Sequence, residues 1–278
     1  MPTRRESGET LPLRYTGPMP PDSSPLARRV LEFLAALPPA PGPRVLAING
    51  PQGCGKSTLA AELVAHAART PESGRALAVS IDDFYLTHAA QRALAAAHPG
   101  NPYLEHRGYP GTHDVALGTR TLTALRSHAP DRVPVPRYDK SAHGGRGDRA
   151  PEHTWPVVET PLDLLIVEGW MLGFRPVSPP PSDPRLRAPN AALADYAAWL
   201  TGVQAFVHLS ATSPEHIVAW RVDAERARRN SGAPALSDAE ARDYIERFLP
   251  AYALWGVSPD VPALRITLDA SRRPATTQ

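Results

Sequence analysis

The chain has 278 residues and carries 30 Lys and Arg against 28 Asp and Glu, a formal net charge of +2. This length fits one large α/β domain with a sizeable core, and the balanced charge argues against a broad nucleic-acid-binding surface. Cys54 is the single cysteine, which excludes an intramolecular disulfide and suits a reducing compartment. No apolar run approaches the ~20 residues of a membrane helix, and the N-terminal MPTRRESGETLPLRY lacks the apolar core of a secretory signal. We therefore expect a cytoplasmic protein that binds neither nucleic acid nor a membrane; the sequence does not determine its oligomeric state.

Prolines mark the irregular parts of the chain. The 33 prolines cluster in TGPMPPDSSP, LPPAPGPR and RPVSPPPSDPRLRAP. The first two clusters flank the short helical pattern LARRVLEFLAAL, so residues 1–43 are predicted to form a proline-rich arm with one short helix. The third cluster, between Phe174 and Asn190, predicts an extended surface loop.

Five apolar runs bounded by turn signals predict strands, and helical patterns lie between them. The runs are residues 44–48, 76–81, 162–169, 204–210 and 263–269. They are mostly apolar and do not alternate, which is typical of strands buried on both faces of a parallel sheet. The expected fold is α/β, a doubly wound and mainly parallel sheet flanked by helices, with its chemistry at the carboxyl ends of the strands.

The first predicted strand leads into G-x-x-x-x-G-K-S, Gly50 to Ser57, followed by the helical pattern TLAAELVAHAA. This pattern in this context predicts a phosphate-binding loop (P-loop), and residues 44–278 are expected to form a domain of the P-loop NTPase fold. Gly50, Gly53 and Gly55 are expected to adopt positive φ, and Thr58 to start the helix. Lys56 should reach the β and γ phosphates of ATP, and the Ser57 hydroxyl should bind Mg²⁺. The predicted nucleotide-binding residues are Gly50, Pro51, Gln52, Gly53, Cys54, Gly55, Lys56, Ser57 and Thr58.

Acidic residues follow two of the other predicted strands. Asp82 and Asp83 come directly after the second strand, and Glu168 lies at the end of the third. The two aspartates could simply cap the next helix, but facing a P-loop a carboxylate can accept a proton or help to hold a metal. Burial of a lone glutamate is costly without a partner, so Glu168 is expected to lie near Mg²⁺.

A glycine-rich basic segment, residues 133–149, predicts a loop that closes on an anionic substrate. It carries Arg137, Lys140, Arg146 and Arg149, and guanidinium groups suit carboxylates and phosphates. A solvated surface excursion is the alternative. Residues assigned to substrate binding are Asp114, Arg137, Tyr138, Lys140, Arg146 and Arg149.

Four motifs in this order after the P-loop carry a family resemblance: SIDDFYL, HPGNPYLEHRGYPGTHDV, VPRYDKSAHGGRGDR and IVEGWMLGF. The chain from Arg44 to its last strand resembles the plant-type D-glycerate 3-kinase family, which is similar to phosphoribulokinase, uridine kinase and pantothenate kinase. The resemblance implies ATP- and Mg²⁺-dependent phosphorylation of the 3-hydroxyl of D-glycerate, a small hydroxy acid, to 3-phosphoglycerate.

The resemblance also implies roles for individual residues. Asp82 matches the aspartate of a D-x-F motif near the acceptor hydroxyl, with Asp83 ranked second, and Glu168 matches the glutamate of an E-G pair. The segment SPEHIVAWRVDAERARRN resembles a lid whose arginines fold over the transferring phosphoryl group. Arg221 is its first candidate, with Arg228 and Arg229 behind it, and a solvated helix face with Arg and Glu pairs is the alternative. The segment WGVSPDVPALRI, before the last strand, is expected to flank the adenine.

The predicted catalytic residues are thus Lys56, Asp82, Asp83, Glu168 and Arg221, with Ser57 and Glu168 as the metal ligands. Two other functions stay open. One is a kinase of the same fold for pantothenate, a nucleoside or a sugar, because function depends on the site and not on the fold. The other is a regulatory module that binds a nucleotide without turnover.

Overall fold

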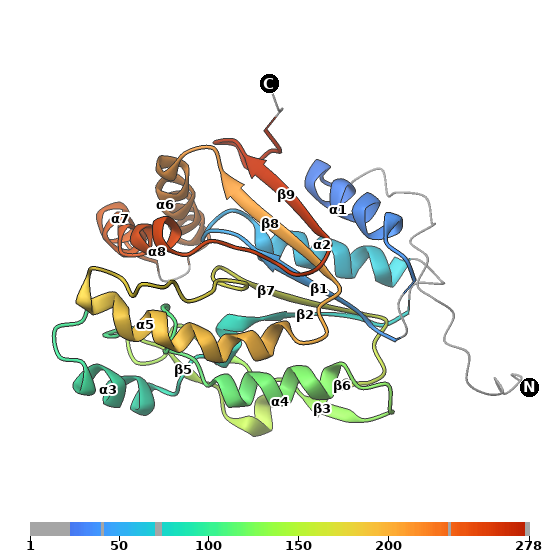
Figure 1. The fold of residues 1–278 in the computed structure, drawn as a ribbon, viewed down its shortest axis with the longest axis horizontal. Coiled ribbons are helices and arrows are strands. Elements are labelled where there is room, and N and C mark those ends of the chain that lie inside the picture. The colour runs from blue at the N-terminus through green and yellow to red at the C-terminus, as the bar shows by residue number, and fades with distance from the viewer. Residues whose placement is uncertain (1–22, 40–41, 70–73, 233–234, 276–278) are drawn as a thin grey trace, which may run out of the picture.

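The computed structural model describes residues 23–39, 42–69, 74–232 and 235–275. A five-stranded parallel sheet with the order β2-β7-β1-β8-β9 forms its centre (Figure 1). The strands are β1 (Arg44–Asn49), β2 (Ala76–Ser80), β7 (Leu164–Gly169), β8 (Ala205–Ala211) and β9 (Ala263–Leu268). Each begins and ends within two residues of a predicted run, so the predicted doubly wound α/β sheet is confirmed.

The strand order brings the ends of three strands together. The chain passes from β1 to β2 across the position that β7 later fills, and β7 pairs with both neighbours. Asn49 lies beside Gly169, and Ser80 lies beside Glu168. Every residue of β1 and β7 is buried, which explains why their sequences are continuous apolar runs. The segments that follow β1, β2 and β7 therefore leave the sheet at one edge.

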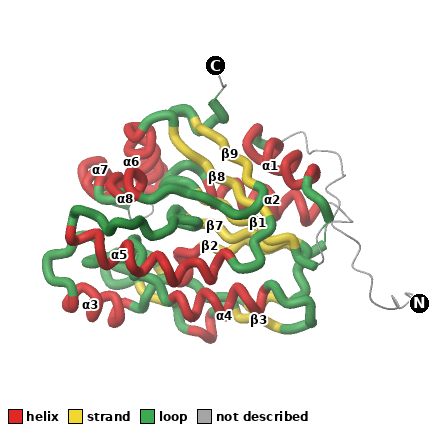
Figure 2. Tube along the Cα trace, viewed as in Figure 1, coloured by secondary structure: helices red, strands yellow, loops and turns green. Residues whose placement is uncertain are grey.

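Helices cover both faces of the sheet. They are α1 (Pro25–Ala36), α2 (Lys56–Arg69), α3 (His88–Ala97), α4 (Val115–Leu125), α5 (Arg187–Ala192), α6 (Pro214–Asn230), α7 (Asp238–Glu246) and α8 (Leu249–Leu254). Helix α2 packs on β1, β2 and β7, and α1 packs on α2. Helices α4 and α5 lie together on the other side of the sheet (Figures 1 and 2). No helix in the described ranges is long and apolar enough to cross a membrane.

The short helix predicted in the N-terminal region is confirmed as α1. The Ser24 hydroxyl caps it by accepting a hydrogen bond from the Ala27 amide, and Pro25 occupies the first helical position. Its apolar side chains, Val30 and Leu34 among them, belong to the same hydrophobic core as β1. The arm that was predicted before the helix, residues 1–22, lies outside the described residues, and the division of the chain at residue 43 stays a prediction.

The basic segment forms a short hairpin instead of an irregular loop. Strand β4 (Tyr138–Asp139) pairs antiparallel with β5 (Asp148–Arg149). The Arg107 guanidinium donates to the carbonyls of Gly145 (2.9 Å) and Arg146, so it holds the intervening turn from outside. A second small sheet pairs β3 (Arg132–Pro134) with β6 (Val157–Glu159).

The third proline cluster is only partly the predicted surface loop. From Pro184 the chain forms one 3-10 turn and then α5, so the loop prediction is wrong for its second half. The side chain of Asn190 in α5 is buried, accepts from the Val177 amide (2.8 Å) and donates to the Val177 carbonyl (3.1 Å). The two bonds pair the amide and the carbonyl of Val177, which lies in an extended segment that belongs to no sheet. Composition alone did not reveal this contact.

Candidate active site

The P-loop leaves β1 as the sequence predicts, with one correction to the role of its glycines. Gly53 (φ +79°) and Gly55 (φ +97°) adopt the left-handed conformation that glycine favours. Gly50 does not, so its predicted positive φ is wrong. Only glycine fits at this position, because a Cβ atom there would lie 2.8 Å from the Leu209 Cβ and 2.9 Å from the Cys54 Sγ.

Two residues at the start of α2 face the end of β7. The helix begins at Lys56, two residues before the predicted start at Thr58, so the P-loop amides precede a helix N-terminus that favours anions. The Lys56 Nζ donates to the Pro51 carbonyl (3.0 Å), and the Ser57 hydroxyl donates to the Glu168 Oε1 (2.8 Å). Glu168 is only 6% exposed, and this hydroxyl is a partner that its carboxylate requires.

Residues from the C-terminal part of the chain fix the P-loop, and the sequence analysis missed them. The Gln52 amide donates to the Tyr252 hydroxyl (3.2 Å). The Arg272 guanidinium donates to the Gly53 carbonyl through Nε (2.8 Å) and to the Trp220 carbonyl through Nη2 (3.2 Å). These two contacts tie the loop to α8, to α6 and to the turn after β9.

The segment that was expected to flank the adenine leads into β9. Its Val257 pairs with Phe174, which follows β7, and the chain then reaches the amino end of β9. The turn after β9 contacts the P-loop directly. The role of the segment beside the adenine stays a prediction.

Asp82 lies in a 3-10 turn, Ile81–Phe84, that continues directly from β2. Its Oδ2 is 2.5 Å from the Lys140 Nζ. Burial acts to raise the pKa of Asp82, but the charge and the hydrogen bond of Lys140 outweigh it and lower the pKa to about 2. The Lys140 pKa is correspondingly raised by the charge of Asp82. The carboxylate is therefore ionised at neutral pH.

Asp83 has different partners and faces the hairpin. Its Oδ2 is 3.1 Å from the Arg137 Nη1, and its Oδ1 accepts from the Tyr138 amide (3.1 Å). Burial raises its pKa, although Arg137 acts in the opposite direction. Neither aspartate caps α3, whose N-cap is the Thr87 side chain, so the helix-cap alternative is wrong.

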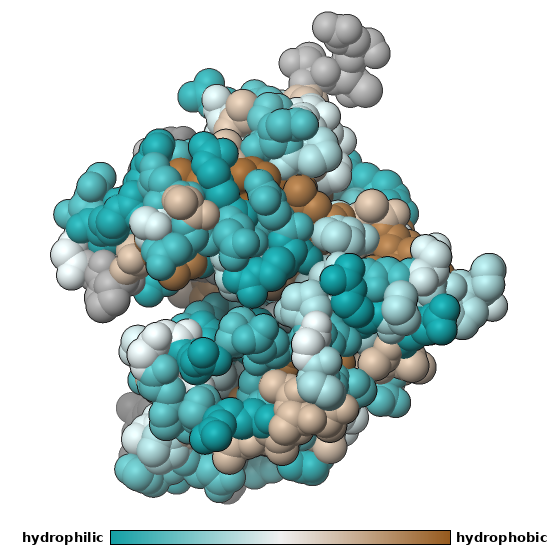
Figure 3. All heavy atoms as spheres, turned by 90° about the vertical axis from the view of Figure 1, so that its left-hand side faces the viewer, coloured by the Kyte–Doolittle hydropathy of each residue, from teal (hydrophilic) through white to brown (hydrophobic). Residues whose placement is uncertain are grey.

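These side chains line one cleft of about 480 Å³ at the carboxyl edge of the sheet. Figure 3 shows a hollow across the middle of the face on which α3, α6 and α7 lie in Figure 1, and the surface around it is mostly hydrophilic. The predicted residues that line the cleft are Gln52, Gly53, Lys56, Ser57, Asp82, Asp83, Arg137, Lys140, Glu168 and Arg221. Ser80, Gly169 and Trp170 also line it and were not predicted. Their position beside Asp82 and Glu168 in the sequence was the available signal.

Four predicted substrate-binding residues do not line the cleft. The Arg149 Nη2 is 3.1 Å from the Asp114 Oδ2, and Asp114 caps α4. The Tyr138 ring packs edge-on against Tyr85, whose side chain hydrogen-bonds Asp82. Arg146 is exposed and lies 3.4 Å from the His106 Nδ1. Among the predicted cations of the basic segment, Arg137 and Lys140 thus line the cleft, and Arg146 and Arg149 do not.

Of the three candidate lid arginines, Arg221 lines the cleft and the other two do not. Its guanidinium lies 2.6 Å from the Glu225 Oε1 and 4.7 Å from the centre of the Tyr244 ring. Arg228 and Arg229 lie in the last turn of α6, where Arg229 pairs with Asp238. The solvated-face alternative therefore describes the end of α6 and not Arg221.

The residues around the Ser57 hydroxyl fit a magnesium ion that is shared with phosphates. Ser57 and Glu168 offer two oxygen ligands, and Mg²⁺ in nucleotide sites takes few protein ligands and completes its shell with phosphates and water. No cluster of three or more His, Cys, Asp and Glu side chains that could hold a metal occurs within the described ranges. The donor set thus suits an ion that arrives with a nucleotide.

Known proteins resemble this chain over most of its length. No family model matches it. The chloroplastic D-glycerate 3-kinase of Arabidopsis thaliana is 40% identical over 248 residues, 84% of this chain and 54% of that protein, so this chain spans about half the length of that relative. An uncharacterized kinase of Schizosaccharomyces pombe is 35% identical over 88% of this chain and 95% of that protein. A solved D-glycerate 3-kinase from Cryptococcus neoformans has a TM-score of 0.79 and 28% identity, and covers 92% of this chain and 99% of its own.

The fold, the P-loop and these relatives define the class of P-loop kinases. Identity of 35% across nearly the whole of one relative is sufficient to define the family. The chain belongs to the D-glycerate 3-kinase-like family of P-loop kinases.

Proposed function

We propose that this kinase transfers the γ-phosphoryl group of ATP to the 3-hydroxyl of D-glycerate and forms 3-phosphoglycerate. The observation that carries the proposal is the division of the cleft. One wall is the P-loop with Lys56, and the other presents Asp82 together with the cations Arg137 and Lys140. An acceptor that carries a carboxylate near its reactive hydroxyl suits that second wall. The cations can bind the carboxylate of the acceptor, while Asp82 accepts a hydrogen bond from its hydroxyl.

The charges of the second wall support a small acid as the acceptor. Lys140 keeps Asp82 ionised, so the Asp82 carboxylate can accept a hydrogen bond from the acceptor hydroxyl at neutral pH. Arg137 is held by Asp83 and Lys140 by Asp82, so neither cation has to be ordered when an anion binds. Fixed charges of this kind stabilise a transferring phosphoryl group without reorganisation cost.

The nucleotide side of the cleft would hold ATP with Mg²⁺. Ser57 and Glu168 would hold the ion, which neutralises charge on the transferring phosphoryl group when it is bound. Lys56 would bind the phosphates, and the P-loop amides at the start of α2 would orient them.

The aromatic content of the cleft argues against a nucleoside acceptor. Trp170 is the one aromatic residue that lines the cleft in the described part of the chain, and its indole is buried and donates to the Gly108 carbonyl (3.0 Å). Phe84 and Tyr109, which a stacking pocket could have used, belong to the core. A nucleoside pocket needs an accessible aromatic face, so a small acid is the better fit.

A coupled ADP-release assay tests the proposal. The full chain with ATP and Mg²⁺ is given D-glycerate, L-glycerate, pantothenate, uridine or ribulose 5-phosphate, and the product is identified by phosphorus NMR. The expected result is a kcat/KM for D-glycerate at least ~100-fold above the others. Uridine has no acid group for Arg137 and Lys140 to bind, and the other three acceptors place their hydroxyl groups differently relative to their anion. A higher kcat/KM for any other acceptor, or phosphorylation at the 2-hydroxyl, contradicts the proposal.

A further inference from the structure

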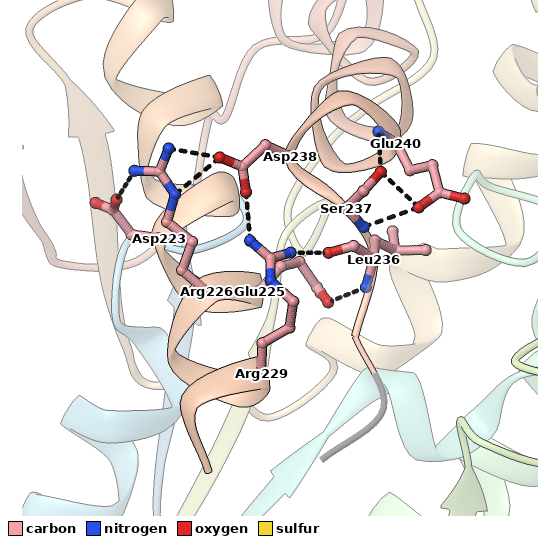
Figure 4. Close-up of polar contacts among 8 residues, drawn as sticks. All are labelled: Asp223, Glu225, Arg226, Arg229, Leu236, Ser237, Asp238 and Glu240. Carbon is pink, nitrogen blue, oxygen red and sulfur yellow. Dashed lines mark hydrogen bonds and ion pairs between the residues drawn. The ribbon is translucent and has the colours of Figure 1, made fainter. Parts of the chain in front are cut away.

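Helix α6 contains a buried carboxylate whose two oxygens have different partners. Glu225 is 2% exposed. Its Oε1 lies 2.6 Å from the Arg221 Nη2, and Arg221 lines the cleft. Its Oε2 accepts a hydrogen bond from the Leu236 amide (2.9 Å), in the connection between α6 and α7 (Figure 4). One side chain thus joins the cleft to the α6–α7 connection.

This burial distinguishes Glu225 from the other charged residues of α6. An i,i+4 pair on a solvated face is worth little, and such pairs need no burial. A carboxylate out of contact with water is costly unless it is paired and hydrogen-bonded. Glu225 has a cation on one oxygen and an amide on the other, while Arg226 and Arg229 on the same helix are exposed.

Helix α7 provides the second support for Arg221. The Tyr244 ring lies under the guanidinium at 4.7 Å, within the range of a cation–π contact. Arg226 and Arg229 both pair with Asp238 at the start of α7 (Figure 4). The first turn of α7 is also closed by a capping box between Ser237 and Glu240. The beginning of α7 is therefore fixed to α6 on the outside, and Arg221 is held between Glu225 and Tyr244 on the inside.

We propose that Glu225 is a positioning residue that orients the Arg221 guanidinium towards the γ-phosphoryl group of the bound nucleoside triphosphate. A guanidinium at that position contributes to catalysis only if its direction is fixed, because a small misplacement of a charged donor costs much of its effect. The carboxylate supplies this direction, and its bond to the Leu236 amide prevents it from turning away. The proposal rests on the proposed function in that it takes Arg221 to contact the transferring group.

The proposal predicts a difference between ATP and ADP that requires no acceptor. A guanidinium aimed at the γ-phosphate strengthens the binding of ATP and has no partner in ADP. Glu225→Gln keeps the shape of the side chain and can still accept from the Leu236 amide, but its neutral amide no longer holds the cation. We expect the ratio of the ADP and ATP dissociation constants to fall about tenfold, the worth of a charged hydrogen bond, and kcat to fall about 10- to 100-fold.

The experiment compares five forms of the full chain: wild type, Glu225→Gln, Arg221→Ala, the double variant and Arg226→Gln. Both dissociation constants are measured by calorimetry with Mg²⁺, kcat with D-glycerate by ADP release, and folding by thermal unfolding. Arg226→Gln is the matched control, because it removes a charge from the same helix and breaks exposed ion pairs with Asp223 and Asp238 without touching Arg221. Arg229 still pairs with Asp238 in this variant, so α7 keeps its connection to α6. The nucleotide ratio and kcat of the control should stay within about twofold of wild type, as for a surface ion pair.

The double variant separates positioning from a structural role. If Glu225 acts through Arg221, then Glu225→Gln has no further effect on the nucleotide ratio or kcat once Arg221 is alanine. An additive loss, or a wild-type nucleotide ratio in folded Glu225→Gln, overturns the proposal. If Glu225→Gln does not fold, Glu225→Asp replaces it, because it keeps the charge but draws it back from Arg221 by one methylene. A nucleotide ratio equal to wild type in that variant then overturns the proposal. If no variant phosphorylates D-glycerate, the acceptor proposal fails, while the nucleotide ratio still decides the role of Glu225.

Discussion

The adjacent carboxylates Asp82 and Asp83 have different partners and therefore different properties. Asp82 faces Lys140 and keeps a low pKa, about 2, while Asp83 has both oxygens engaged by Arg137 and the Tyr138 amide. A carboxylate with so low a pKa is a weak proton acceptor at neutral pH, so its main contribution is to orient the acceptor hydroxyl. Asp83 instead fixes the hairpin that carries Lys140.

We expect Asp82→Asn to lower kcat by about 10²-fold, the low end of the range for general-base residues. The amide keeps the size of the side chain and can still accept a hydrogen bond, but it loses the charge that Lys140 balances. The KM for ATP should change by less than about threefold, since the shape of the cleft is retained, while the acceptor KM rises because Lys140 loses the carboxylate that holds it. Steady-state kinetics with ATP and D-glycerate measure this.

Asp83→Asn is the matched comparison for Asp82→Asn. Because Asp83 acts on the hairpin, its amide should mainly lower thermal stability and raise the acceptor KM, through a looser Arg137. A larger loss of kcat in Asp83→Asn than in Asp82→Asn would show that the two roles are reversed.

Lys140 and Arg146 lie six residues apart in the same segment but only Lys140 lines the cleft. Lys140→Met should raise the acceptor KM about 10-fold or more, because a charged hydrogen bond to the acid is lost, and leave the KM for ATP within about twofold. Arg146→Met should change neither value. Equal effects of Lys140→Met on both substrates would assign Lys140 to phosphate binding.

At the scale of the elements, the P-loop depends on contacts from the end of the chain. Arg272→Met removes the bonds to the Gly53 and Trp220 carbonyls, so the loop loses its connection to the turn after β9. We expect the KM for ATP to rise about 5- to 50-fold, because the two charged hydrogen bonds connect the P-loop to α6, with the acceptor KM unchanged. The neighbouring exposed Arg273, changed to Met, is the control. The same KM for ATP in both variants would contradict a role for Arg272 in ordering the P-loop.

Elements with a strong local signal could be predicted, and those formed by distant contacts could not. The strands are continuous apolar runs, and the P-loop has glycines at fixed spacing beside a strand and a helix. The hairpin β4–β5 was taken for a loop because its glycines and charges have no strand period, and Arg107 stabilises it from another segment. Helix α5 was missed for a similar reason, since Pro184 and Pro189 suggest a loop while Asn190 ties the segment to Val177.

The same distinction applies to the cleft. Lys56, Asp82 and Glu168 could be predicted because Glu168 lies at the end of a strand and the other two follow one, and parallel strands end at the same edge. Arg272 and Glu225 have no such signal. Arg272 acts on a carbonyl 219 residues away, and Glu225 acts through its burial and its bond to the Leu236 amide.

At the scale of the whole molecule, two histidines with lowered pKa values lie where segments meet, His113 buried and His208 half-buried. His113, 4% exposed, stacks on Tyr85 and bonds the Tyr196 hydroxyl through Nδ1 (2.9 Å). Burial lowers its pKa to about 3, although Asp82 acts in the opposite direction. His208 on β8 lies 2.9 Å from the Asn49 Oδ1, and burial and Arg265 lower its pKa to about 4.

These lowered pKa values make the free energy of unfolding depend on pH between about 4 and 6.5, the ordinary pKa of an exposed histidine. In this window the unfolded chain binds protons at both positions and the folded protein does not, so stability is complete above pH 6.5 and is lost as the pH falls. The Asp82 pair contributes little to this change, because a carboxylate with a pKa lowered to about 2 loses its stabilisation only below its unfolded value near 3.8. Each histidine can contribute a slope of up to about 1.4 kcal/mol per pH unit.

His113→Phe keeps the stacking on Tyr85 without a titrating group. Urea unfolding at pH 7, 6 and 5 should therefore give a dependence of the free energy of unfolding on pH whose slope is lower by up to that amount. Adding His208→Gln should flatten it further. A slope in His113→Phe equal to wild type would mean that the segment around His113 opens to water in the folded protein and takes up its proton there.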